Sequence, residues 1–108
     1  MHQPRLKSRF LMEACLGLCS EKGIPATVVK RGDPEAGAIY LKINGLENNC
    51  IVLSQAYDVE GVLYWVKACG GIQITEQEAD LFIERQIKYD NDIWVLEVED
   101  KLLRNPYG

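Results

Sequence analysis

Apolar side chains recur along this chain with two different periods, and each change of period marks a new element. Near the start they return every three or four residues, which is typical of one face of a helix and predicts a helix over residues 5–22. Gly23 suits the left-handed residue that follows a helix, Ile24 can fold back on Cys19, and Pro25 cannot continue the helix. The apolar stripe consists of Leu6, Phe10, Leu11, Ala14, Cys15, Leu18 and Cys19.

The pattern then changes to short runs rich in β-branched and aromatic residues, separated by turn residues. Such runs predict strands. The connections between them are too short for a parallel crossover, so we expect consecutive strands to pair antiparallel as a meander. The predicted strands cover residues 26–31, 38–43, 50–57 and 62–68.

A second helix and a last strand follow. Thr75 and Glu78 form a capping box that predicts a helix ending at about Tyr89. The run at 93–99 alternates in its second half, which predicts a strand with Trp94, Leu96 and Val98 toward the helices and Glu97 and Glu99 on the opposite face.

These elements predict an α+β fold in one domain, residues 1–108. The order is α-β-β-β-β-α-β, with an antiparallel sheet of about five strands and two helices packed on one face. A chain of 108 residues is expected to hold one core, and its composition is that of an ordinary globular protein. In this arrangement the other face of the sheet would remain open.

The net charge of −4 disfavours nucleic acid as a partner. Residues 1–31 hold six Lys/Arg against two Asp/Glu, a charge of +4, whereas residues 32–108 hold six against fourteen, a charge of −8. No apolar stretch is long enough to span a membrane, and Glu13 interrupts the only run that resembles a signal peptide. We therefore expect a cytoplasmic protein whose cysteines are reduced.

The segment from Arg31 to Gly37 is the first candidate ligand site. Its backbone N–H groups could bind an anion, with Arg31 as a charged partner. Asp33 followed by proline is also typical of a side-chain-capped turn, with Gly37 supplying an unusual dihedral angle. This structural interpretation is the favoured one.

The second candidate is the densest group of carboxylates in the chain, around the last strand. It consists of Glu97, Glu99 and Asp100, joined by Asp90 and Asp92. Carboxylates that converge can hold a divalent ion or share a proton. However, Glu97 and Glu99 at a spacing of two also match the solvent face of a strand. A solvated face is therefore favoured over a site.

The cysteines and the histidine do not form a recognisable metal-binding or catalytic motif. Cys15 and Cys19 lie on the apolar stripe, and no Cys-x-x-Cys knuckle accompanies Cys50 or Cys69, so we expect buried thiols and neither a metal nor a cofactor. The only histidine, His2, lies near the terminus, away from any serine or cysteine nucleophile in the fold. No catalytic residue is predicted, and a non-enzymatic role is favoured.

Aromatic residues suggest a contact surface. Trp65 and Trp94 could stack on a ligand, but an indole in a strand more often fills the core. Tyr40 and Tyr64 fall at alternate strand positions, where they could share the exposed face of the sheet. They are the candidate interface residues.

Several segments resemble one bacterial family. These are Pro4–Ser8, Gly23–Ala26, Arg31–Asp33 with Ala36–Ala38, and above all Asp92–Asp100 with its Trp-x-x-Glu-x-Glu-Asp pattern. Together they resemble an alphaproteobacterial family catalogued as a domain of unknown function (family 1491). The resemblance implies a shared fold and a cytoplasmic bacterial origin, and it implies no activity.

Two functions remain open from the sequence. The first is a module that binds itself, as a homodimer, or another protein through the open sheet face and an edge strand. The opposite charges of the two segments could steer such an association. The alternative is a protein that binds a small molecule or an anion, and that could be an enzyme, with a site formed by the Arg31–Gly37 turn and the Glu97–Asp100 carboxylates.

Overall fold

The computed structural model describes residues 7–107. His2 and the first residues of the predicted helix lie outside the described residues. The order of elements is confirmed, with one short 3-10 turn, η1, added before the second helix. In chain order the elements are α1 (Ser8–Lys22), β1 (Ala26–Lys30), β2 (Ile39–Asn44), β3 (Cys50–Tyr57), β4 (Leu63–Lys67), η1 (Cys69–Gly71), α2 (Glu76–Tyr89) and β5 (Trp94–Glu99).

The local start and stop signals act as predicted. Gly23 adopts the left-handed conformation at φ 68°, and the Ile24 N–H donates to the Cys19 carbonyl at 2.8 Å, which closes the end of α1. At the start of α2, Thr75 accepts from the Glu78 backbone N–H while the Glu78 side chain accepts from the Thr75 N–H. A left-handed glycine therefore closes the end of α1, and a side-chain capping box opens α2.

The five strands form one mixed sheet in the order β1-β5-β2-β3-β4. Three of the pairings are antiparallel and one, between β2 and β5, is parallel. The expected meander is therefore wrong at one point, because β5 inserts between β1 and β2. Every residue of β5 up to Leu96 is buried, and a strand with apolar side chains on both faces is most stable in the middle of a sheet.

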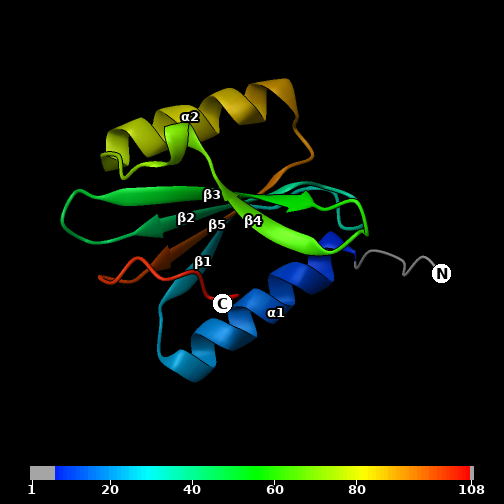
Figure 1. Cartoon of the computed structure of the whole chain (residues 1–108), viewed down its shortest axis with the longest axis horizontal. Coiled ribbons are helices and arrows are strands. Elements are labelled where there is room, and N and C mark those ends of the chain that lie inside the picture. Colours follow the sequence, from blue (N-terminus) through cyan, green and yellow to red (C-terminus); the bar gives the residue numbers. More distant parts are fainter. Residues whose placement is uncertain (1–6, 108) are drawn as a thin grey trace.

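The two helices cover opposite faces of the sheet, with α2 above it and α1 below it in Figure 1. Leu11, Met12 and Cys15 of α1 pack on one face, against Leu41 and Leu96 among others. Ala79 and Ile83 of α2 pack on the other, against Val52 and Val95. The prediction that both helices lie on one face is wrong, because β2 and β5 carry apolar side chains toward both sides and each side needs a cover.

The C-terminal segment adds to the α1 side of the core. The Tyr107 ring stacks on Trp65 with 4.9 Å between ring centroids, and its hydroxyl donates to the Leu11 carbonyl at 2.5 Å. Burial is the main reason that the pKa of Tyr107 is raised above its ordinary value. The segment after β5 is thereby attached both to α1 and to the edge of the sheet at β4.

Candidate functional site

The Arg31–Gly37 turn lies at the N-terminal end of β5, and its polar groups are engaged in local contacts. The Asp33 carboxylate accepts from the Ala36 N–H at 2.9 Å, and the Asp33 N–H donates to the Asp92 carbonyl at 2.9 Å. The Trp94 indole N–H donates to the Asp33 carbonyl at 2.7 Å. Arg31 lies 5.7 Å from the centre of the Trp94 ring. These contacts attach the turn to β5.

Gly37 is needed for close packing rather than for its backbone angle. A Cβ on Gly37 would lie 2.2 Å from the Asp92 carbonyl oxygen, and a Cβ on Gly32 would lie 2.1 Å from the same atom. The glycines with positive φ among the described residues are Gly23, Gly61 and Gly70, so the predicted unusual dihedral at Gly37 is not found. The turn also binds α1, since the Ser8 hydroxyl donates to the Gly37 carbonyl at 2.5 Å.

The structure does not bring this turn and the C-terminal carboxylates together. Asp33 and Asp100 lie at opposite ends of β5, whose 6 residues separate them by about 20 Å. The Asp100 carboxylate accepts from the Arg104 side chain at 2.8 and 3.1 Å and from its backbone N–H at 2.9 Å. These bonds, chiefly those from the Arg104 side chain, lower the pKa of Asp100 to about 2.

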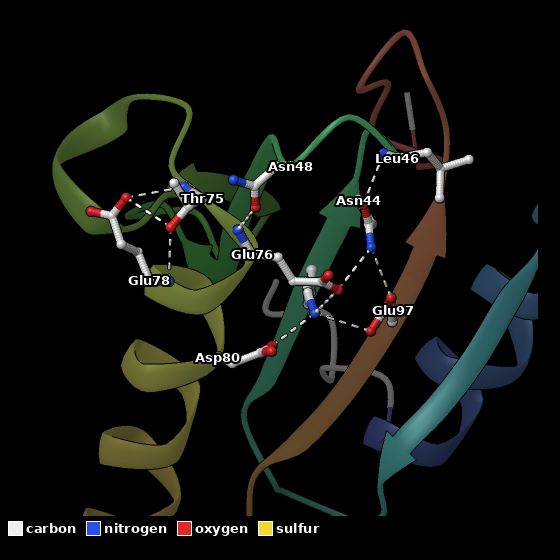
Figure 2. A network of polar contacts seen from close by, with 9 residues as sticks. Asn44, Leu46, Asn48, Thr75, Glu76, Glu78, Asp80 and Glu97 are labelled. Atoms are coloured by element: carbon white, nitrogen blue, oxygen red, sulfur yellow. Dashed lines mark hydrogen bonds and ion pairs between the residues drawn. The ribbon is translucent and has the colours of Figure 1, made fainter.

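Glu97 belongs to a different group, the ion cluster around Lys42. The Lys42 side chain is only 5% exposed, and its ammonium lies 2.7 Å from Asp80, 2.9 Å from Glu76 and 3.3 Å from Glu97. Asn44 also donates to Glu76 at 2.9 Å and to Glu97 at 3.3 Å. Figure 2 shows the carboxylates of α2 and β5 pointing toward a common centre between the helix and the sheet.

The electrostatics of the cluster keep Lys42 protonated. Burial by itself lowers the pKa of Lys42, but hydrogen bonds to Asp80 and Glu76 and the charge of Glu97 outweigh it, so that the pKa is raised. A lysine that remains an ammonium at neutral pH does not act as a nucleophile or a base. The cluster therefore connects α2 to β2 and β5 through a charged lysine.

Sequence reasoning missed this cluster because it assigned Glu97 to the solvent face of its strand and gave Lys42 no role. The two residues lie opposite each other in the parallel β2–β5 pair. An opposite-charge pair on neighbouring strands would have been the signal, but it becomes visible only once β5 is placed beside β2. The adjacent groove, of about 430 Å³, lies between α2 and the sheet and is lined by Lys42, Glu76, Asp80, Glu84, Glu97 and the apolar Val29, Ile83, Ile87 and Val95.

Of the two predicted interface tyrosines, Tyr40 is covered and Tyr64 is exposed. The Tyr40 ring packs edge-on against Phe82 of α2 at 6.0 Å, and its hydroxyl lies 3.3 Å from the Gln86 side-chain oxygen. Tyr64, on β4, is 49% exposed. An open sheet face that carries both residues does not exist, because α2 covers the β2 part of that face.

The edge of the sheet at β4 remains available. β4 is the last strand in the sheet order, and its pairing partner is β3. Hydrogen bonds join Asp58 N–H to the Val62 carbonyl and Ala68 N–H to the Val52 carbonyl. Because bonded residues alternate along an antiparallel pair, Leu63, Trp65 and Lys67 direct their own N–H and C=O groups away from the sheet.

An open groove of about 490 Å³ runs along this edge. Leu63, Tyr64 and Trp65 line it from the strand, and Asn105 and Tyr107 line it from the C-terminal segment. On the α2 side of the strand, Val62 is 57% exposed and Val66 is 41% exposed, with Tyr64 between them. Among residues 7–107, outward backbone groups without a strand partner therefore occur together with exposed apolar side chains at β4. We call residues 62–67 the β4 edge.

The cysteines do not gather into a site. Cys15 and Cys19 lie on the α1 face of the sheet, whereas Cys50 lies on the α2 face. Burial raises the pKa of the Cys15 thiol to about 12. Within residues 7–107 no group of His, Cys, Asp and Glu has the arrangement of a metal site, and no helix there is long and apolar enough to cross a membrane.

Residues 6–107 match a family whose description is "Protein of unknown function (DUF1491)". This match spans nearly the whole chain. The protein belongs to the DUF1491 family. The resemblance deduced from the Asp92–Asp100 segment is thereby confirmed, and the function of the family is unknown.

Solved structures of related proteins share the fold. A DUF1491 protein from Caulobacter crescentus with a crystal structure shares 30% sequence identity with this chain. The match covers 90% of each chain and has a TM-score of 0.79. An NMR structure of a DUF1491 protein from the same organism is 28% identical, covers 96% of this chain and 94% of its own, and gives a TM-score of 0.80. The protein Atu0922 from A. tumefaciens, known from a solution structure, is 24% identical in sequence. The match covers 89% of this chain and 86% of that chain, with a TM-score of 0.76. No curated protein matches the chain.

Proposed function

We propose that this protein is a non-enzymatic interaction module that binds a protein partner by adding the partner's strand to the β4 edge. In strand addition the main chain supplies affinity, and alternate side chains supply specificity. The observation that carries the proposal is the row of outward N–H and C=O groups at Leu63, Trp65 and Lys67, flanked by the exposed Val62 and Tyr64.

Natural proteins usually protect such an edge with charges, proline or a covering segment. Here Lys67 is the one charged residue of β4, and the C-terminal segment leaves a groove beside the strand. The apolar side chains next to the groove would be stabilised by burial against a partner. The binding of a small molecule between the Arg31–Gly37 turn and the Asp100 carboxylate receives less support, because these groups lie about 20 Å apart.

Photo-crosslinking in the living bacterium tests the proposal. A photoreactive phenylalanine derivative replaces Tyr64 in one version of the full chain and the exposed Glu13 of α1 in another. We expect a discrete protein adduct from position 64 and none from position 13.

A second pair of variants tests whether the contact uses the strand backbone. Lys67→Pro removes one outward N–H at an edge position that tolerates proline, and Lys67→Ala retains it. We expect the adduct from position 64 to disappear with proline and to persist with alanine. The absence of any adduct at position 64, or an adduct that is indifferent to Lys67→Pro, would refute strand addition.

A further inference from the structure

We propose that the partner of the β4 edge is a second copy of this chain, paired antiparallel about a twofold axis at Tyr64. This inference rests on the proposed function and identifies its partner. The pairing would join two five-stranded sheets into one continuous sheet, with each β4 edge covered by the other.

The side chains of the β4 edge are arranged symmetrically about Tyr64. Val62, Tyr64 and Val66 alternate along the strand and point to the same face, where they are 57%, 49% and 41% exposed. A twofold axis at Tyr64 places Tyr64 opposite Tyr64 of the second copy, and Val62 opposite Val66. These are aromatic and β-branched cross-strand pairs, which stabilise a sheet when they lie on one face.

The backbone fits the same register. With Tyr64 on the axis, the outward groups of Leu63 face those of Trp65 in the second copy, and the reverse pair forms by symmetry. Each such pair exchanges an N–H and a C=O in both directions, so about four main-chain hydrogen bonds form. Tyr64 itself lies at a non-bonded position, where the Cα atoms of opposite residues approach to about 4.5 Å.

On the other face of the strand, the Leu63 side chain of the second copy would lie in the groove lined by Trp65, Asn105 and Tyr107. Leu63 of the second copy lies opposite Trp65, whose ring stacks on Tyr107, and Asn105 lines the same space. An aliphatic side chain next to two stacked aromatic rings is a favourable apolar contact.

The charges agree with this register. Lys67 lies opposite Gly61 of the second copy and therefore next to Glu60 in its Asp58–Gly61 turn, and the symmetry repeats this opposite-charge contact. An axis at Trp65 instead would place Val62 opposite Ala68 and lose two of the symmetric valine contacts. The register at Tyr64 is therefore the one that both side chains and charges favour.

Light scattering after size exclusion tests for the dimer across a range of protein concentrations. Tyr64→Asp places two carboxylates against each other on the axis, and we expect it to weaken the dimer by about tenfold or more. Tyr89→Asp is the matched control, since Tyr89 is 88% exposed at the far end of α2 and should leave the dimer unchanged. A wild-type protein that is a monomer at every concentration would refute self-association.

Disulfide trapping tests the register. In a Cys69→Ser background, which removes the half-buried native thiol, Tyr64→Cys should form an intermolecular disulfide readily, because opposite residues at a non-bonded position lie within disulfide reach. Val66→Cys lies on the same face, but in the Tyr64 register its two copies are separated by four residue positions, about 13 Å. Rapid trapping through Val66→Cys and not through Tyr64→Cys would overturn this register.

The two sets of experiments separate the two proposals. A crosslink from position 64 to a different protein, together with a strictly monomeric chain, would refute the second copy as partner and leave strand addition in place. A crosslink between two identical chains would support both. Without an adduct at position 64, both proposals are wrong.

Discussion

Replacement of Lys42 by methionine is expected to destabilise the protein strongly, although the substitution creates no cavity. Methionine fills nearly the same volume as the lysine stem, so the main change is the loss of one positive charge. In the wild-type protein this ammonium lies within 3.3 Å of three carboxylates, those of Glu76, Asp80 and Glu97. Its removal leaves three negative charges facing one another between α2 and the sheet.

The magnitude follows from how far the carboxylates are buried. Removal of one partner from a fully buried ion pair costs about 3–5 kcal/mol. Here the lysine is 5% exposed, but Glu76, Asp80 and Glu97 are 46%, 54% and 23% exposed, so water screens part of their repulsion. We therefore expect the free energy of unfolding to fall by about 2–3 kcal/mol for Lys42→Met.

Urea denaturation followed by tryptophan fluorescence measures this cost. Lys101→Met is the control, because Lys101 is exposed in the turn after β5 and its replacement should change the free energy of unfolding by no more than about 0.5 kcal/mol. Addition of Glu97→Gln to Lys42→Met removes one of the repelling charges and should restore about 1 kcal/mol. A cost for Lys42→Met as small as that of Lys101→Met would refute the reasoning.

The pH dependence gives a second test of the same cluster. The pKa of Lys42 is raised in the folded state, so its contribution to stability is fully present at neutral pH and is lost only as the pH rises above the ordinary lysine value of about 10.4. The deficit of Lys42→Met should therefore stay constant between about pH 7 and pH 9. A deficit that shrinks as the pH rises over this range would contradict the electrostatic explanation.

Four further variants probe other contacts by urea denaturation. Thr75→Ala removes the capping box of α2 and should cost about 1 kcal/mol; no change would mean that the cap does not stabilise the helix. Gly37→Ala places a Cβ 2.2 Å from a backbone carbonyl oxygen and should cost about 2–4 kcal/mol, whereas Gly17→Ala, with free space around its Cβ, should stabilise α1 by about 0.5–1 kcal/mol. Asp100→Asn should destabilise the protein at neutral pH, because it removes the carboxylate that pairs with Arg104. Arg104 lowers the folded pKa of Asp100 to about 2, so the loss of stability should fade as the pH drops toward that value. A loss of stability that does not depend on pH would count against this ion pair.

Much of the local structure was predictable because its causes lie within a few residues. The end of α1 depends on Gly23 and Pro25, and the start of α2 depends on Thr75 and Glu78, so the boundaries follow from neighbouring backbone and side-chain groups. The predicted strands agree with the observed ones to within one residue at each end. Tyr64 was also identified as an exposed aromatic residue from alternation alone.

The arrangement of these elements depended on a contact that no local signal reports. β2 and β5 pair in parallel although 49 residues separate Asn44 from Trp94 along the chain, and this pairing decides which strands are central. With β5 in the centre, both faces of the sheet are apolar, so α1 and α2 must cover opposite sides. Alternation along a strand shows that two faces differ, but it does not show which one a distant helix will cover.

The candidate sites also differ in whether the sequence or the tertiary structure determined them. The sequence by itself determined the family, the elements and the turn at Asp33, because each depends on residue types at short spacing. Only the tertiary structure decided that Glu97 joins Lys42 and that β4 is left at the edge with Tyr64 exposed. Both outcomes follow from the place of β5 in the sheet, since a strand that inserts beside β2 brings Glu97 to Lys42 and leaves β4 without an outer neighbour.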